Sequence, residues 1–200
     1  MSMIYDIISV IVHIHHIRLS CRGYGGGSEN RMSILQHPFG PLFSKNSRVL
    51  ILGSFPSVKS REQNFFYGHP QNRFWKVVAA VFNQPVPQSI EEKRGLILEN
   101  GLALWDSIAS CHITGSSDAS IRNVRVNDIG IILDSCNIEC IYCNGRKSHE
   151  LYCRYIEPET GRRAICLPST SPANAQWTLE KLIEAWSVIT GGEKNDQCFK

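Results

Sequence analysis

The run Val49-Leu50-Ile51-Leu52-Gly53 decides the fold class of this chain. An unbroken apolar run that ends in glycine is typical of a strand buried on both faces, and such strands occur mainly in parallel sheets. Similar runs at residues 102–105, 138–143 and 164–167 predict three further strands. The sequence therefore predicts a central parallel sheet of four strands.

Helical patterns separate these strands. Residues 74–81 carry apolar side chains with the i, i+3, i+4, i+7 spacing of one helix face. Ser89 and Glu92 form a capping-box signal for a helix that runs toward residue 100, and residues 145–155 and 179–189 predict two more helices. Strands that alternate with helices indicate an α/β fold in which helices cover both faces of the sheet. Ligands bind such sheets at the carboxyl ends of the strands.

The composition is that of a globular domain. The 200 residues are 42% hydrophobic and 20% charged with a net charge of +3, which excludes disordered, collagen-like and coiled-coil chains. This weak positive charge permits a nucleic-acid partner without requiring one. The apolar stretch at residues 4–17 is interrupted by Asp6 and three histidines, so we expect no membrane span. We also expect no secretory signal, and the eight cysteines are therefore expected to be free thiols.

The chain is expected to divide into three parts. Residues 1–31 contain Gly25, Gly26 and Gly27 and predict a disordered extension that is not needed for folding. The folded domain is expected at residues 32–190. Residues 191–200 follow the last helical pattern and predict a loose tail.

Neither a metal nor a cofactor is predicted. Cys136, Cys140 and Cys143 have a spacing found in iron–sulfur enzymes, but too few residues follow them for the barrel that such chemistry uses. Two cysteines three positions apart on one strand also point to opposite faces. A zinc site that adds His149 and Cys153 would straddle a strand and a helix, so buried cysteines explain the pattern better.

Two loops at the expected carboxyl edge carry the chemistry. The first, residues 54–73, contains the adjacent aromatics Phe65-Phe66-Tyr67 among basic residues, a combination that suits bases and phosphates. Tyr67 lies outside any helical stripe, which favours a functional role, whereas Phe74 and Trp75 fit the core side of the next helix. The second loop, residues 168–174, is small and stiffened by prolines. It suits close approach to a backbone, or equally an ordinary turn before a helix capped by Thr178.

Three motifs in this order resemble those of the uracil-DNA glycosylase superfamily. They are Gly53-Ser54-Phe55-Pro56-Ser57, Tyr67-Gly68-His69-Pro70-Gln71-Asn72-Arg73-Phe74-Trp75 and Leu167-Pro168-Ser169-Thr170-Ser171-Pro172. The chain looks closest to the hypoxanthine (deoxyinosine) DNA glycosylases and, more distantly, to the mismatch-specific uracil and thymine glycosylases. The resemblance implies a three-layer α/β/α sandwich, in agreement with the periodicity.

The resemblance also implies a role for each motif. It places Gly53, Ser54, Phe55, Pro56, Ser57 and His69 around a flipped nucleotide, and Tyr67 where an aromatic ring stacks on the extruded base. The loop that enters the duplex corresponds to Pro168, Ser169, Thr170, Ser171, Pro172 and Asn174. Lys59, Arg61 and Arg73 are expected to contact DNA. The implied reaction is metal-free hydrolysis of an N-glycosidic bond.

Two positions depart from the superfamily pattern. Phe55 stands where many members place an Asp or Asn that positions water, and Leu167 stands where the uracil-specific branch has a histidine. Hypoxanthine-type enzymes share both departures and are thought to depend on the asparagine that corresponds to Asn72, which makes Asn72 the predicted catalytic residue. Its amide can donate to a base or accept from water. Asn72 could also cap the helix that follows it, and capping and catalysis could coexist.

The sequence thus predicts a monofunctional DNA glycosylase of base excision repair. The expected partner is double-stranded DNA that contains a deaminated base, with hypoxanthine first and uracil, xanthine or mispaired thymine as alternatives. We expect a monomer in the cytoplasm with the nucleoid, or in a nucleus. The alternative is a damaged-DNA-binding module that keeps the fold and pocket without hydrolysis.

Overall fold

A computed structural model describes residues 34–114 and 118–191, so the expectations for residues 1–31 and for the tail beyond Gly191 lie outside the described residues and stay predictions. The described region contains the predicted four-stranded parallel sheet. Its order is β3-β2-β6-β7. The strands are β2 (Val49–Gly53), β3 (Leu102–Asp106), β6 (Cys140–Asn144) and β7 (Ile165–Leu167). All residues of β2 and β3 are buried, as expected from their continuous apolar runs.

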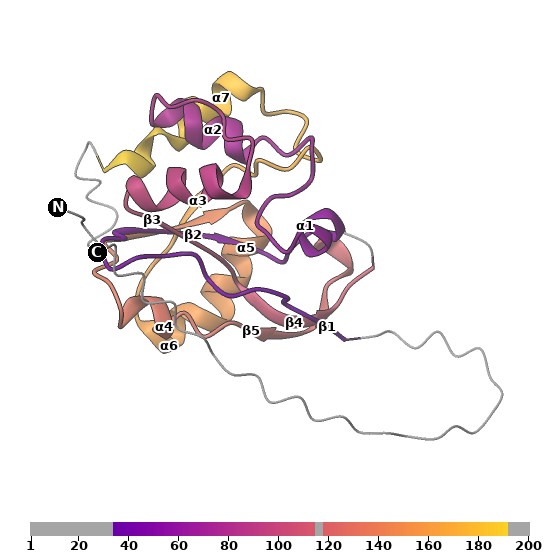
Figure 1. Cartoon of the computed structure of the whole chain (residues 1–200). Helices are drawn as coiled ribbons and strands as arrows, with labels where there is room; N and C mark the ends of the chain where they lie inside the picture. Colours follow the sequence, from indigo (N-terminus) through magenta and orange to yellow (C-terminus); the bar gives the residue numbers. More distant parts are fainter. Residues whose placement is uncertain (1–33, 115–117, 192–200) are drawn as a thin grey trace. The chain divides into compact units, whose positions relative to one another are not determined.

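Helices cover both faces of this sheet, which confirms the three-layer α/β/α sandwich. Figure 1 shows α2, α3 and α7 on one side and α4, α5 and α6 on the other. The helical elements are α1 (Val58–Gln63), α2 (Phe74–Val81), α3 (Ile90–Glu99), α4 (Gly130–Leu133), α5 (Arg146–Leu151), the π-helical turn η2 (Tyr152–Ile156), α6 (Glu157–Thr160), α7 (Leu179–Trp186) and the 3₁₀ turn η3 (Ser187–Thr190). Within the described residues, none of these helices is long and apolar enough to cross a membrane.

Local signals in the sequence explain where several helices begin and end. The predicted capping box is present, because Ser89 accepts from the Glu92 N–H and the Glu92 carboxylate accepts from the Ser89 N–H. The helix predicted at residues 145–155 begins at Arg146, changes at Tyr152 to a π-helical turn and continues as α6 to Thr160. The last helix continues into η3, and Gly191 ends it with a φ of 70°.

A second, three-stranded antiparallel sheet was not predicted. It has the order β1-β4-β5 and consists of β1 (Leu35–Gln36), β4 (Ile108–His112) and β5 (Arg122–Val126), with the 3₁₀ turn η1 (Asp118–Ser120) before β5. Irregular register between β4 and β5 breaks the alternation by which such strands are recognised. This sheet packs on a smaller core of Phe55, Ile108, Cys111, Ile121 and Leu151.

The carboxyl ends of the parallel strands form one row. Gly53 pairs with Asp106 across β2 and β3, and Asn144 pairs with Leu167 across β6 and β7. The chain passes from β2 to β3 on one side and reaches β6 on the other side of β2, so β2 and β6 flank the point at which the strand order reverses. Sheets of this kind bind ligands at that point.

Candidate active site

Asp106 and Gly53 form the first part of the site. A Cβ atom on Gly53 would overlap Oδ1 of Asp106 and would lie 3.4 Å from the Tyr67 hydroxyl. A side chain at the end of β2 would therefore force the Asp106 carboxylate to move. The absent side chain brings the Asp106 carboxylate and the Tyr67 hydroxyl to the β2 backbone.

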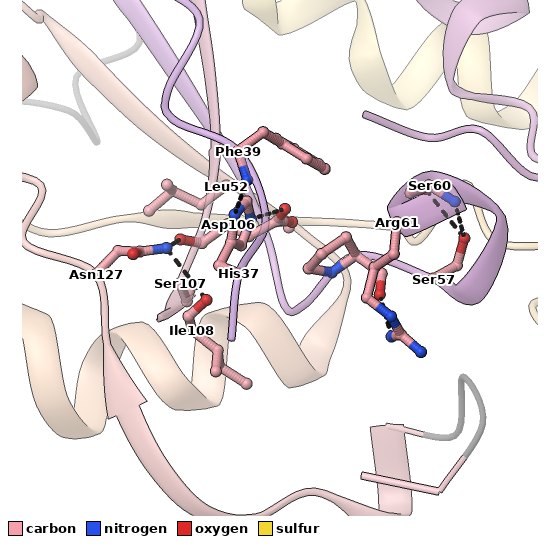
Figure 2. Close-up of polar contacts among 12 residues, drawn as sticks. His37, Phe39, Leu52, Ser57, Ser60, Arg61, Asp106, Ser107, Ile108 and Asn127 are labelled. Atoms are coloured by element: carbon pink, nitrogen blue, oxygen red, sulfur yellow. Dashed lines mark hydrogen bonds and ion pairs between the residues drawn. The ribbon is translucent and has the colours of Figure 1, made fainter. Parts of the chain in front are cut away.

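Asp106 is oriented by a histidine from the start of the described chain. His37 Nε2 donates to Asp106 Oδ2 at 2.8 Å, and the two side chains are only 3% and 7% exposed. The Phe39 N–H donates to His37 Nδ1 at 3.4 Å, which assigns the imidazole proton to Nε2. The Asp106 carbonyl accepts from Asn127 Nδ2 at 2.8 Å. Figure 2 shows these contacts meeting at Asp106.

His37 could not have been predicted from the sequence. It follows the two-residue strand β1, which has no apolar pattern, and it reaches Asp106 over a separation of 69 residues. Asp106 itself directly follows a predicted strand. Its place at a carboxyl strand end is a signal that could have identified it.

Tyr67 lies between Asp106 and Asn144 and has a strained backbone. Its φ is 50°, a value that few residues other than glycine adopt. Its ring stacks on Phe74 with centroids 3.8 Å apart and planes at 18°. The hydroxyl is buried and has no hydrogen-bond partner among the described residues. Burial and then the Asp106 carboxylate raise the pKa of Tyr67. The nearby Asn144 side chain, which lies outside hydrogen-bond geometry but close enough to favour the phenolate, opposes this effect, and the hydroxyl stays protonated.

Asn72 lies where three elements meet. Its Oδ1 accepts from the Phe74 N–H at 3.0 Å, at the start of α2, and from the Thr170 hydroxyl at 2.9 Å. Thr170 is in turn bonded to Asn144, the last residue of β6, through Asn144 Nδ2 and Oδ1, each at 2.9 Å. Asn72 thus also acts as a partial cap of α2, because it accepts from one N–H of the first turn. The Asn72 Nδ2 group donates to no described residue.

Arg73 organises the loop at residues 168–177. Its guanidinium donates to the carbonyls of Thr170 at 3.3 Å, Ser171 at 2.6 Å, Asn174 at 3.0 Å and Trp177. These contacts give Arg73 an internal role, since a guanidinium fork can satisfy several carbonyls at once. The expected contact of Arg73 with DNA stays a prediction.

The rest of the second loop is also held in a fixed shape. Asn174 Nδ2 donates to the Ser169 carbonyl at 2.9 Å, and Trp186 Nε1 donates to the Pro168 carbonyl at 3.0 Å. Thr170 is fully buried, so its side chain faces the protein rather than an approaching duplex. Pro172 is exposed, and Ser171 is half-buried. The loop is therefore a preformed projection whose outer residues are available for contact.

The first motif makes several contacts within the protein, and its expected role in a base pocket stays a prediction. Phe55 is buried in the smaller core and meets His37 edge-on at 6.0 Å. Ser57 caps α1 by accepting from the Ser60 N–H at 3.2 Å. The Ser54 carbonyl accepts from Ile108 N–H at 3.1 Å, so this part of the chain extends the pairing beyond the sheet.

The remaining residues of the predicted set lie on or near α1. Arg61 donates to the Pro56 carbonyl at 2.8 Å, and Lys59 pairs with Glu62 at 2.8 Å on the surface. His69 Nδ1 accepts from the Gln71 N–H at 3.2 Å. The structure thus brings Gly53, Tyr67, Asn72 and the second loop into one network around Asp106 and Asn144, while Lys59 lies at the exposed surface.

No metal centre is evident in the described part of the chain, where no group of three or more His, Cys, Asp or Glu residues could hold an ion. Five cysteines there are free thiols, as expected: Cys111, Cys136, Cys143, Cys153 and Cys166. The expectation is wrong for Cys140, the first residue of β6, which is disulfide-bonded. A disulfide depends on which distant cysteine the fold brings near, and cysteine spacing alone does not show this. Burial raises the pKa of the Cys143 thiol to about 12. Cys143 therefore acts as an apolar core residue rather than a nucleophile.

Comparison with known proteins identifies the family. The model of the uracil DNA glycosylase superfamily matches residues 41–190. The chain belongs to the uracil DNA glycosylase superfamily. Its site residues all lie inside that matched segment except His37, which precedes it.

Individual members of the superfamily agree with this assignment. A hypoxanthine DNA glycosylase of Methanosarcina barkeri is 32% identical over 152 residues, covering 74% of this chain and 94% of the relative. A hypoxanthine DNA glycosylase of Methanosarcina acetivorans is 29% identical over 161 residues, covering 78% of this chain and 98% of the relative. A solution NMR structure of a protein from M. acetivorans matches with a TM-score of 0.67 and 29% identity. The match covers 79% of this chain and 97% of that protein, whose name assigns it provisionally to the uracil DNA glycosylases.

Membership of this superfamily establishes the class of reaction. The protein is a DNA glycosylase, a hydrolase of N-glycosidic bonds whose substrate is DNA. The resemblance inferred from the three motifs is thereby confirmed.

Proposed function

We propose that this glycosylase removes hypoxanthine, the base formed when adenine is deaminated, from double-stranded DNA. The two relatives named hypoxanthine DNA glycosylase support this choice of base. The protein is proposed to act as a monomer in the compartment that holds the DNA. Uracil, xanthine and mispaired thymine are the alternatives that the test must separate from hypoxanthine.

The position of Asn72 carries this proposal. Its amide is anchored to α2 through Phe74 N–H and to the second loop through Thr170, beside the carboxyl end of β6. Phe55 and Leu167 have apolar side chains that can neither position water nor donate a proton, and both are buried. Asn72 is therefore the polar group of the three motifs that is best placed to touch the reacting nucleotide.

The base must leave the duplex to reach this site. A base stacked inside DNA is inaccessible to residues at the edge of a sheet, so the enzyme flips the nucleotide into the protein. Gly53 presents only backbone to the incoming base. Tyr67, pre-stacked on Phe74, supplies an aromatic wall with a fixed orientation.

The surface around the site supplies the DNA contacts. The preformed loop at residues 168–174 is proposed to fill the space that the flipped nucleotide leaves, with exposed Pro172 at its outer side. Lys59 and Arg61, on the short helix α1, are proposed to contact phosphates. Arg73 supports the loop from within through its four carbonyl contacts.

The reaction proposed is simple hydrolysis. As the C1′–N bond breaks, positive charge develops on the sugar and negative charge on the base, and water then adds to C1′. No lysine stands at a matched motif position, so we propose no Schiff-base step and an intact abasic site as the product.

The test uses four labelled duplexes that carry inosine, uracil, xanthine or mispaired thymine at one position. Excess protein is added, abasic sites are cleaved with alkali, and strand lengths are measured over time. We expect the fastest cleavage with inosine and a loss of about 10²- to 10³-fold in Asn72→Ala. Asn137→Ala, at an exposed asparagine before β6, is the matched control.

The outcomes separate the hypotheses. Faster cleavage of another duplex would reassign the base. A normal single-turnover rate in Asn72→Ala would refute the catalytic assignment. Tight binding of the inosine duplex with no abasic product would indicate a protein that binds damage without cleaving it.

A further inference from the structure

Two backbone N–H groups fix the orientation of the Asn72 and Asn144 side-chain amides. A backbone N–H can only donate, so the Asn72 atom that lies 3.0 Å from Phe74 N must be the carbonyl oxygen. By the same reasoning, the Asn144 atom 2.9 Å from Thr170 N must be Oδ1. Neither amide can be rotated by 180° without placing two donors against each other.

The orientation of Asn144 determines which way the Thr170 hydroxyl points. With Oδ1 on the Thr170 N–H, Asn144 Nδ2 faces the Thr170 oxygen at 2.9 Å and donates to it. The hydroxyl proton must then point elsewhere, and Asn72 Oδ1 lies 2.9 Å away. The three side chains form a one-way series of donors from Asn144 through Thr170 to Asn72. Because Thr170 is fully buried, water does not compete for these bonds.

This series uses one end of the Asn72 amide and leaves the other free. Oδ1 accepts two hydrogen bonds, which fill its two lone pairs. Nδ2 keeps both N–H groups, since it donates to no described residue. Asn72 is therefore prepared to donate to a ligand, and it has no free lone pair with which to orient water.

From this geometry we propose that Asn72 acts as a hydrogen-bond donor to the departing base and does not hold the nucleophilic water, and that Thr170 and Asn144 are positioning residues that fix this polarity. The inference rests on the proposed function, in which Asn72 touches the reacting nucleotide. It decides between the two roles that the residue type alone leaves open.

The step balances as follows. The C1′–N bond breaks and its electron pair moves to the base, whose ring nitrogen or carbonyl oxygen accepts a hydrogen bond from Asn72 Nδ2. This bond strengthens as negative charge develops, so it lowers the barrier. Water bonds to C1′ and releases its proton to solvent, and the base takes up a proton after it departs.

Asn72→Asp separates the two roles. Aspartate keeps the shape of the side chain and can still accept from the Phe74 N–H and the Thr170 hydroxyl, but it has no N–H to donate. If Asn72 donates to the base, Asn72→Asp should lose at least the ~10²- to 10³-fold of Asn72→Ala in the single-turnover rate, since a carboxylate also repels the departing anion. If Asn72 holds water, a carboxylate should serve as well or better. The loss of one net hydrogen bond in the transition state corresponds to about a tenfold lower rate. A single-turnover rate for Asn72→Asp within about threefold of the unmodified protein would therefore overturn the proposal.

Thr170→Val tests the positioning residues, because valine keeps the shape and removes the hydroxyl. We expect about a 10-fold slower chemical step with unchanged duplex affinity, and recovery of most of that rate in Thr170→Ser. Thr190→Val, at an exposed threonine in η3, is the matched control. Equal rates for the Val and Ser variants would refute the positioning role.

Asn144→Asp is the second probe, which serves if Thr170→Val does not fold. Its carboxylate still accepts from the Thr170 N–H, but it cannot donate to the Thr170 hydroxyl, which then turns away from Asn72. We expect a slower chemical step with retained binding, and an unchanged rate would refute the series of donors. A normal rate in Asn72→Ala would sink the proposed function itself, whereas a slow Asn72→Ala with a fast Asn72→Asp would refute only the donor role.

Discussion

Replacing Arg73 with lysine tests whether this residue holds the second loop or contacts DNA. Lysine keeps the positive charge, so any long-range attraction to phosphate is retained. It loses the planar fork that reaches the carbonyls of Thr170, Ser171, Asn174 and Trp177. A single ammonium group cannot reach four carbonyls spread over eight residues of loop.

The expected loss of stability follows from these contacts. Each hydrogen bond contributes about 1 kcal/mol net, and lysine can replace one or two of the four, so the variant should lose about 2 to 3 kcal/mol. For a domain of this size, that corresponds to a melting temperature lower by roughly 4 to 12 °C. Because the loop is half-exposed, water can bind some of the carbonyls that lose Arg73. We therefore expect a loss of stability nearer the lower end of this range.

The assay combines thermal unfolding with duplex binding over a salt series. Arg94→Lys, at an exposed arginine of α3, is the matched control. If Arg73 holds the loop, its variant should melt earlier while the salt dependence of binding keeps its slope. An unchanged melting temperature together with a log–log salt slope smaller by about one would show a phosphate contact and refute the internal role.

Three further variants test other parts of the structure. Gly53→Ala should push the Asp106 carboxylate away from its place, destabilise the protein by the roughly 1 to 3 kcal/mol of an overpacked site and slow cleavage, and a wild-type melting temperature and cleavage rate would contradict the packing described. Tyr67→Phe removes a buried hydroxyl that lacks a described partner, so urea unfolding should show equal or greater stability, and a loss above about 1 kcal/mol would reveal a partner. Hydrogen bonds from the Gln88 and Ser89 N–H groups lower the pKa of Glu92. The ionised Glu92 carboxylate therefore stabilises the folded protein at pH values above its pKa in the unfolded state, and this stabilisation is lost as the pH falls through the lower pKa of the folded state. The melting-temperature advantage over Glu92→Gln should therefore be present at pH 7 and shrink as the pH falls below the ordinary range of a glutamate, and a pH-independent difference would refute the charge effect.

The parallel sheet could be predicted from the sequence because burial on both faces leaves continuous apolar runs, as in β2. The β1-β4-β5 sheet could not, since its short strands alternate poorly and β1 has only two residues. The order of the motifs predicted the family, which the comparisons confirm, whereas the catalytic role of Asn72 stays a prediction. Residue type alone could not show that Arg73 meets carbonyls or that Phe55 packs in a second core, because both facts depend on which distant segments the fold brings near.

The pairing of His37 with Asp106 determines how far this chain can be shortened. A protein trimmed to the segment that matches the family model would begin at Pro41 and would lack His37. Asp106 would then be a buried carboxylate without a partner, a situation that costs about 3 to 5 kcal/mol. The same cut would remove β1 and leave the edge of β4 unpaired, which invites strand-to-strand aggregation. The functional unit therefore extends N-terminally beyond the segment that the family model matches, at least to β1.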